Sequence, residues 1–130
     1  MNSDLIEQLK SILARFSTIK VAYLFGSQAN GTAGPLSDYD IAIYTDAAAP
    51  SEDFKLRIDI ANAVSKELKT DAVEVLSLNS TESPELKFAV IRDGILLKEV
   101  EPFKVMVEPK IMNEYFDFRE GLRRNNLTKA

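Results

Sequence analysis

The sequence predicts a small α/β (α+β) domain in which helices pack against a mixed β-sheet of three to five strands. Two observations lead to this fold class. Apolar residues at helical spacing alternate along the chain with short apolar runs that are typical of strands. The length of 130 residues is enough for one hydrophobic core but too short for two independent domains.

The first half of the chain predicts two helices and two strands. Apolar residues recur at helical spacing over 4–16, and apolar runs predict strands over 20–25 and 38–44. A second helix is expected from residue 51 to about residue 68, after a linker of small and polar residues. Its predicted apolar face consists of Phe54, Ile58, Ala61, Val64 and Leu68.

The second half predicts a third strand over 70–76, a helix that begins at Ser83 and Pro84, and a short edge strand over 95–97. We expect the site of the protein to lie at one edge of the resulting sheet.

Residues 101–130 are expected to form a helical extension of the domain that occupies residues 1–100. Pro102 and Pro109 should interrupt this extension, because proline lacks the backbone N–H that a helix interior needs. The helix after them should present Ile111, Tyr115, Phe118 and Leu122 on one face. Phe116 lies off this face, so these aromatic residues can serve either the core or, together with nearby arginines, a contact with a partner.

The composition limits the chemistry available to the chain. It contains no Cys and no His, so that catalysis would depend on carboxylates, hydroxyls and metal ions. The net charge of −4 argues against direct binding to nucleic acid and suits a basic protein partner better. The sequence shows neither an apolar run of membrane-spanning length nor a signal peptide, so we expect a cytoplasmic protein that does not enter a membrane.

The stretch from Gly26 to Asp40 is the strongest indication of a functional site. The predicted strand 20–25 ends at Gly26 and Ser27, where a backbone without a side chain can approach a ligand closely. The following residues are rich in Gly, Ser and Thr, and their N–H groups together with the Ser27 hydroxyl could surround a phosphate.

Two carboxylates follow on the next predicted strand. Side chains alternate along a strand, so Asp38 and Asp40 should project from the same face. Such a pair is costly unless a cation lies between the two carboxylates, and Mg²⁺ held by carboxylates and substrate phosphates is a common solution. The pattern therefore predicts phosphoryl or nucleotidyl transfer.

Gly26-Ser27, ten further residues and then Asp38-Tyr39-Asp40 resemble the signature of the DNA polymerase β-like nucleotidyltransferases. More narrowly, the first 100 residues resemble the minimal nucleotidyltransferase (MNT) antitoxins of HEPN–MNT toxin–antitoxin modules. The resemblance implies the polymerase β-like fold, two Mg²⁺ ions and ATP as the donor. It also implies that AMP is transferred to a hydroxyl of a cognate HEPN ribonuclease toxin, with which the chain would form a hetero-oligomer.

The resemblance also assigns roles to individual residues. Gly26, Ser27, Asp38 and Asp40 would bind the nucleotide, and the two aspartates would bind metal and act in catalysis together with a third carboxylate. Many family members carry two arginines just after the Gly-Ser pair, at the places that Gln28 and Asn30 occupy in this chain.

Two acidic residues in the third predicted strand could supply the third carboxylate. Asp71 and Glu74 are three positions apart, so on a regular strand only one of them can face the aspartate pair. The resemblance favours Asp71 as the third metal-binding and catalytic residue, and Glu74 is the alternative.

Two other functions stay open at this point. The chain could be an antitoxin that acts by binding alone, without catalysis. It could also be a nucleotidyltransferase whose acceptor is a small alcohol or an RNA end.

Overall fold

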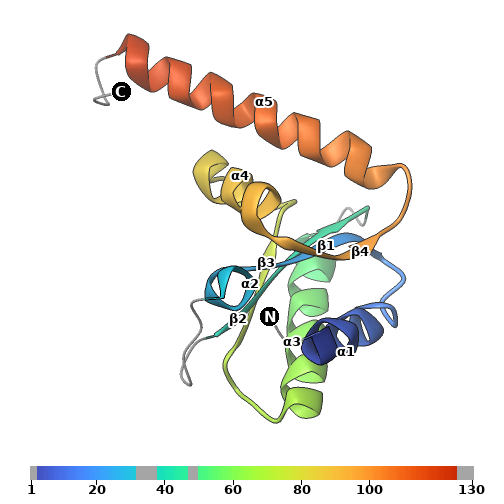
Figure 1. The fold of residues 1–130 in the computed structure, drawn as a ribbon. Coiled ribbons are helices and arrows are strands. Elements are labelled where there is room, and N and C mark those ends of the chain that lie inside the picture. Colours follow the sequence, from blue (N-terminus) through green and yellow to red (C-terminus); the bar gives the residue numbers. More distant parts are fainter. Residues whose placement is uncertain (1–2, 32–37, 47–49, 126–130) are drawn as a thin grey trace.

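The computed structural model describes residues 3–31, 38–46 and 50–125, which form a four-stranded mixed sheet and five helices (Figure 1). The strand order is β3-β2-β1-β4. Strand β1 (Ile19–Phe25) is antiparallel to both β2 (Tyr39–Thr45) and β4 (Ile95–Glu99), whereas β2 is parallel to β3 (Val73–Ser77). The fold class predicted from the sequence is therefore confirmed.

Helices α1 (Ser3–Leu13) and α3 (Pro50–Leu68) cover one face of the sheet (Figure 1). Their apolar positions meet the inward side chains of the two central strands, and full burial of each aliphatic side chain contributes about 1.5–3 kcal/mol. The fully buried members of this layer include Leu9, Ile12, Leu13, Ala22, Leu24, Ile41, Ile43, Ile60 and Val64.

Helices α4 (Pro84–Asp93) and α5 (Phe103–Arg124) lie on the other face (Figure 1). As predicted, Ser83 is the N-cap of α4, and its hydroxyl accepts a hydrogen bond of 3.2 Å from the backbone N–H of Leu86. The α4–α5 contact includes the stacked rings of Phe88 and Tyr115, whose centroids are 4.1 Å apart. This second layer buries Val21, Tyr23, Ala42, Leu78, Val90, Val107 and Ile111.

The predicted break at Pro109 is wrong, because α5 runs through this residue. A proline at this position leaves the carbonyl of Val105 without its helical donor. Pro109 is exposed and Val105 is 72% exposed, so water can satisfy that carbonyl. None of the helices in the described parts of the chain is long and apolar enough to cross a membrane.

The predicted apolar face of α3 is only partly buried. Val64 is fully buried, but Phe54 and Ile58 are 59% and 42% exposed, near the helix start. The first turns of α3 are held by a polar contact instead, in which buried Asp53 accepts a hydrogen bond of 2.7 Å from the Ser77 hydroxyl of β3.

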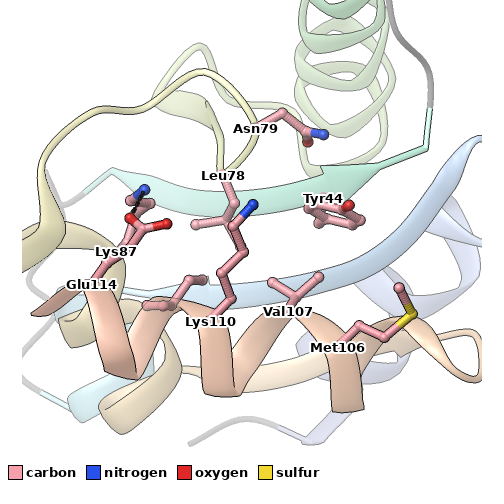
Figure 2. Close-up of a pocket in the computed structure, with 9 residues that line it drawn as sticks. Tyr44, Leu78, Asn79, Lys87, Met106, Val107, Lys110 and Glu114 are labelled. Carbon is pink, nitrogen blue, oxygen red and sulfur yellow. Dashed lines mark hydrogen bonds and ion pairs between the residues drawn. The ribbon is translucent and has the colours of Figure 1, made fainter.

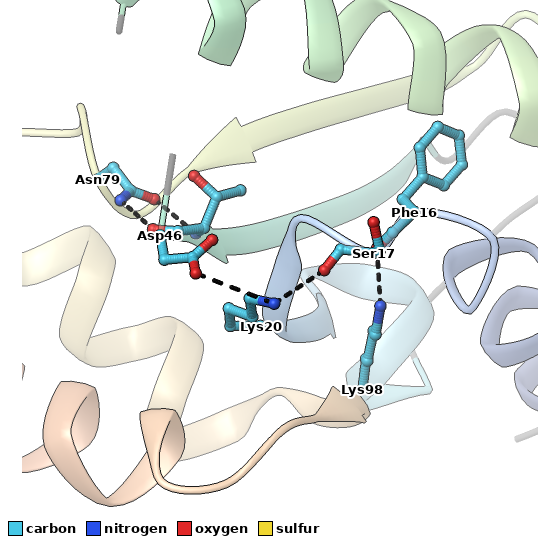
Figure 3. A network of polar contacts seen from close by, with 7 residues as sticks. Phe16, Ser17, Lys20, Asp46, Asn79 and Lys98 are labelled. Atoms are coloured by element: carbon cyan, nitrogen blue, oxygen red, sulfur yellow. Dashed lines mark hydrogen bonds and ion pairs between the residues drawn. The ribbon is translucent and has the colours of Figure 1, made fainter. Parts of the chain in front are cut away.

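Polar contacts stabilise the end of the sheet that is farthest from Gly26 (Figure 3). The Asn79 side chain accepts from the Thr45 N–H at 2.9 Å and donates to the Thr45 carbonyl at 2.7 Å, so it continues the pairing of β2 beyond β3. Lys98 donates to the Phe16 carbonyl at 2.7 Å. Burial and, to a smaller degree, the charge of Lys20 lower the pKa of Lys98.

An ion pair between a buried lysine and a partly exposed glutamate joins α4 to α5. The Lys87 ammonium, on a side chain that is 10% exposed, lies 2.8 Å from a Glu114 carboxylate oxygen. Glu114→Ala should lower the free energy of unfolding by about 1–3 kcal/mol, because it leaves a buried ammonium unpaired. Lys87→Met should cost less, since it removes the charge and keeps the apolar stem. Urea denaturation measures both, and an equal or larger loss in Lys87→Met would contradict the explanation.

Candidate active site

The turn after β1 places the main chain directly against a carboxylate. Gly26 follows β1 with φ 74° and ψ −155° and begins the short helix α2 (Ser27–Asn30). Phe25 pairs with Asp40 of β2, and a Cβ atom added at Gly26 would overlap the Asp40 carboxylate. Only glycine combines the positive φ with this close approach.

Three carboxylates meet beside this turn. Asp38 directly precedes β2, Asp40 is its second residue, and Glu74 is the second residue of β3 and the register partner of Asp40. One oxygen from each of the three residues lies within 4.8 Å of the other two. The parallel pairing of β2 with β3 thus brings together acids that are 34 positions apart in the sequence.

The structure brings Glu74 to this cluster and not Asp71. Strand β3 begins at Val73, three residues later than predicted. The Thr70 hydroxyl accepts from the Ala72 N–H at 3.1 Å, and the Val73 N–H donates to the Asp71 carbonyl at 3.0 Å. These contacts form a turn that holds exposed Asp71 before the strand, whereas Glu74 alternates onto the face of the aspartates.

The cluster has the electrostatics of a cation site. Burial raises the pKa of Asp40 above its usual value, and the charges of Glu74 and Asp38 raise it further. A divalent cation would relieve this repulsion, and convergent carboxylate oxygens are the ligands that Mg²⁺ prefers. These three residues fit a hard divalent cation such as Mg²⁺.

Gly26 and Ser27 stand where the sequence predicted them, at the end of β1 beside Asp40, and Ser27 is the first residue of α2. Gln28 also lies in α2, so the stretch between the two predicted strands begins with one helical turn that ends at Gly31. The remainder of this stretch, residues 32–37, falls outside the described residues.

A separate cavity of about 310 Å³ lies between β2 and α5 (Figure 2). It opens on the same sheet face as Asp40 but at Tyr44, four residues further along β2, or about 13 Å away at 3.3 Å per residue. Its lining includes the Lys87–Glu114 pair, Lys110 and Val107 (Figure 2). The carboxylate cluster and this cavity are therefore distinct.

The repulsion between Asp40 and the other two carboxylates should destabilise the metal-free protein. Asp40→Asn should raise the melting temperature of the metal-free protein by a few degrees at pH 7, because it removes one of three like charges. It should also abolish any further rise that Mg²⁺ causes in the wild type. Asp71→Asn should leave the effect of Mg²⁺ unchanged, and loss of that effect in Asp71→Asn would contradict the assignment of the cluster.

The raised pKa of Asp40 also predicts how the stability of the metal-free protein changes with pH. The folded state binds the Asp40 proton more tightly than the unfolded state, whose Asp pKa is about 3.9. The metal-free wild type should therefore lose stability relative to Asp40→Asn as the pH rises from that value through the raised pKa. Urea denaturation of both proteins between pH 3 and pH 8 measures the difference, and a constant difference would contradict this prediction.

Gly26→Ala should disturb the cluster through sterics. The positive φ costs an L-residue about 1–2 kcal/mol, and the new methyl group would also displace Asp40. Gly31→Ala is the matched control, since Gly31 has φ 78° but none of the described residues places an atom near its added Cβ. Calorimetry should show that only Gly26→Ala weakens Mg²⁺ binding, and equal weakening in both variants would contradict the steric explanation.

Solved toxin–antitoxin structures share this fold. The chain matches a mutant of the MntA–HpeT complex with a TM-score of 0.76 at 21% identity. It matches a toxin–antitoxin structure with AMP-PNP with a TM-score of 0.73 at 23% identity. A third match is to a complex of tri-AMPylated Shewanella oneidensis HEPN toxin with MNT antitoxin, with a TM-score of 0.71 at 20% identity. Each match covers 95% of this chain and 94% of the other.

The family comparison agrees with the geometry of the site. A search of curated proteins found no significant match. The family model described as polymerase beta, nucleotidyltransferase, matches residues 7–102, which include the Gly26 turn and all three clustered carboxylates. Because this match spans most of its length, the chain belongs to the polymerase β nucleotidyltransferase family.

Proposed function

We propose that this chain is an MNT antitoxin that transfers AMP from ATP to a hydroxyl of a HEPN-family toxin. The observation that carries the proposal is the meeting of Asp38, Asp40 and Glu74 beside the Gly26 turn, within a nucleotidyltransferase fold. Three carboxylates at one point are suited to hold divalent cations against a nucleotide triphosphate.

In this mechanism Asp38 and Asp40 would hold two Mg²⁺ ions, which supply charge compensation to the triphosphate and to the attacking oxygen. The main chain at Gly26 and the Ser27 hydroxyl hold the outer phosphates. Gln28 is neutral, where many family members have arginine, so neutralisation of the phosphates depends more on the carboxylate-bound cations. The protein contributes mainly position and electrostatics, as in other phosphoryl-type transfers.

Glu74 takes the role of the third carboxylate in this proposal. It accepts the proton of the acceptor hydroxyl, whose oxygen forms a bond to the α-phosphorus of ATP. The bond from that phosphorus to the oxygen that bridges to the β-phosphate breaks, and pyrophosphate leaves. Glu74 suits this task because it is exposed at the edge of the cluster, where an acceptor can reach it.

The proposed partner is supported by the matched structures, which are toxin–antitoxin complexes and include an AMPylated HEPN toxin. An attached AMP adds bulk and negative charge, and both can block the site of a ribonuclease. The chain and the toxin would form a hetero-oligomer. The net charge of −4 suits a basic protein partner better than a nucleic-acid backbone.

The test is incubation of the purified chain with Mg²⁺, α-labelled ATP and the HEPN-family protein encoded next to it. Label should appear on that protein with the wild type and be abolished by Asp38→Ala combined with Asp40→Ala. If the two proteins form a tight complex without transfer of label, the chain is a binding antitoxin and the proposed activity is wrong. Label on RNA or a small alcohol, and not on the protein, would refute the proposed acceptor.

The third carboxylate is tested by a matched pair of variants. Glu74→Gln should lower kcat by about 10²–10⁴-fold, the usual contribution of a general base. Asp71→Asn should keep nearly wild-type activity, because Asp71 lies outside the cluster. The opposite ranking, with Asp71→Asn inactive and Glu74→Gln active, would return the role to Asp71.

A further inference from the structure

Strand β3 lies next to the carboxylate cluster and is the last strand of the sheet. In the described part of the chain only β2 pairs with it, so its other edge is free there. The Ala72 carbonyl accepts from Tyr39 and the Leu78 N–H donates to Ile43, each at 2.8 Å. Since alternate residues face the same neighbour, the main-chain groups of Val75 point away from β2.

A hollow of about 230 Å³ adjoins this free edge. Helix α3 contributes two exposed side chains of its predicted apolar face, Phe54 and Ile58. Val73 and Val75 line the opposite side, together with Glu74. The hollow and the carboxylate cluster therefore share one residue of β3.

A positioned cation borders the hollow. The Arg57 Nε atom donates to Asp53 at 3.2 Å, and the buried Asp53 carboxylate is itself fixed by the Ser77 hydroxyl. The Arg57 guanidinium carbon lies 5.7 Å from the centre of the Phe54 ring. A guanidinium has five N–H donors, so Arg57 can offer others to a carbonyl or carboxylate.

We propose that the acceptor segment of the partner protein binds here as an added strand on β3, an inference that rests on the proposed function. Its main chain pairs with Val75, and its hydroxyl residue stands opposite Glu74. Side chains alternate, so that hydroxyl residue faces the carboxylates, while its two neighbours in the sequence enter the hollow beside Phe54 and Ile58.

This geometry defines the chemistry of the segment. It is extended, it carries Ser, Thr or Tyr between two apolar residues, and it places a carbonyl or an acidic side chain near Arg57. The argument for this occupant is continuity, because the strand that carries Glu74 also forms one wall of the hollow. An added strand would thus bind the acceptor and orient its hydroxyl through the same contacts.

Phe54→Ala and Ile58→Ala test the hollow, and both side chains are exposed enough for the fold to tolerate the change. Each variant should lower kcat/KM for the HEPN-family protein by about tenfold, as truncation of a central contact does. Affinity for AMP-PNP and the melting temperature should not change. Leu86→Ala on α4 is the matched control, since Leu86 is an apolar side chain that is 38% exposed and does not line the hollow, so this variant should keep wild-type transfer. Unchanged transfer in both α3 variants, or an equal loss in the control, would overturn the inference.

Residue-resolved hydrogen exchange tests the added strand itself. The Val75 amide should become protected by tenfold or more when the wild type binds the HEPN-family protein in the presence of AMP-PNP, because a new main-chain bond forms there. An unchanged exchange rate at Val75 in that complex would exclude strand addition. If the wild type transfers no label at all, the proposed function fails, and this inference fails with it. If the wild type transfers label and only the α3 variants lose transfer, the proposed function stands and the loss is assigned to the hollow.

Discussion

The pairing of β2 with β3 determines whether the three carboxylates of the candidate site meet. Asp40 and Glu74 are register partners, and the hydrogen bond from the Tyr39 N–H to the Ala72 carbonyl begins the ladder just before them. A slip of one residue in β3 would turn Glu74 to the side of α3 and leave the aspartates without a third carboxylate. The repulsion among the three acids opposes this pairing, so the apolar contacts of Val73 and Val75 must hold β3 in place.

Much of the fold could be predicted because the spacing of apolar residues along the chain indicates which side of a helix or strand faces the core. The strands of the sheet and the start of α4 at Ser83 follow from local patterns. The error at Pro109 arises because the tertiary context overrides the local pattern: this proline is tolerated on the solvent side of α5. Helical spacing likewise placed Phe54 on the apolar face of α3 but could not tell that its side chain is 59% exposed.

The site could be predicted in part for a related reason. The Gly26 turn and the two aspartates are close in the sequence, and their spacing carries the signal. Which of Asp71 and Glu74 lies beside the aspartates depends on where β3 begins, and the turn at Thr70 precedes that start. The sequence offered one signal for this placement, since Glu74 stands between two valines whereas Asp71 follows a threonine.

The position of each strand in the sheet also affects how the cluster behaves over time. Strand β2 is paired on both sides, whereas β3 is paired on one, so β3 opens locally at a lower free energy than β2. Such an opening would withdraw Glu74 and leave Asp38 and Asp40 in place. Asp38 and Asp40, and not Glu74, are therefore the residues that would retain a divalent cation at the cluster through such an opening.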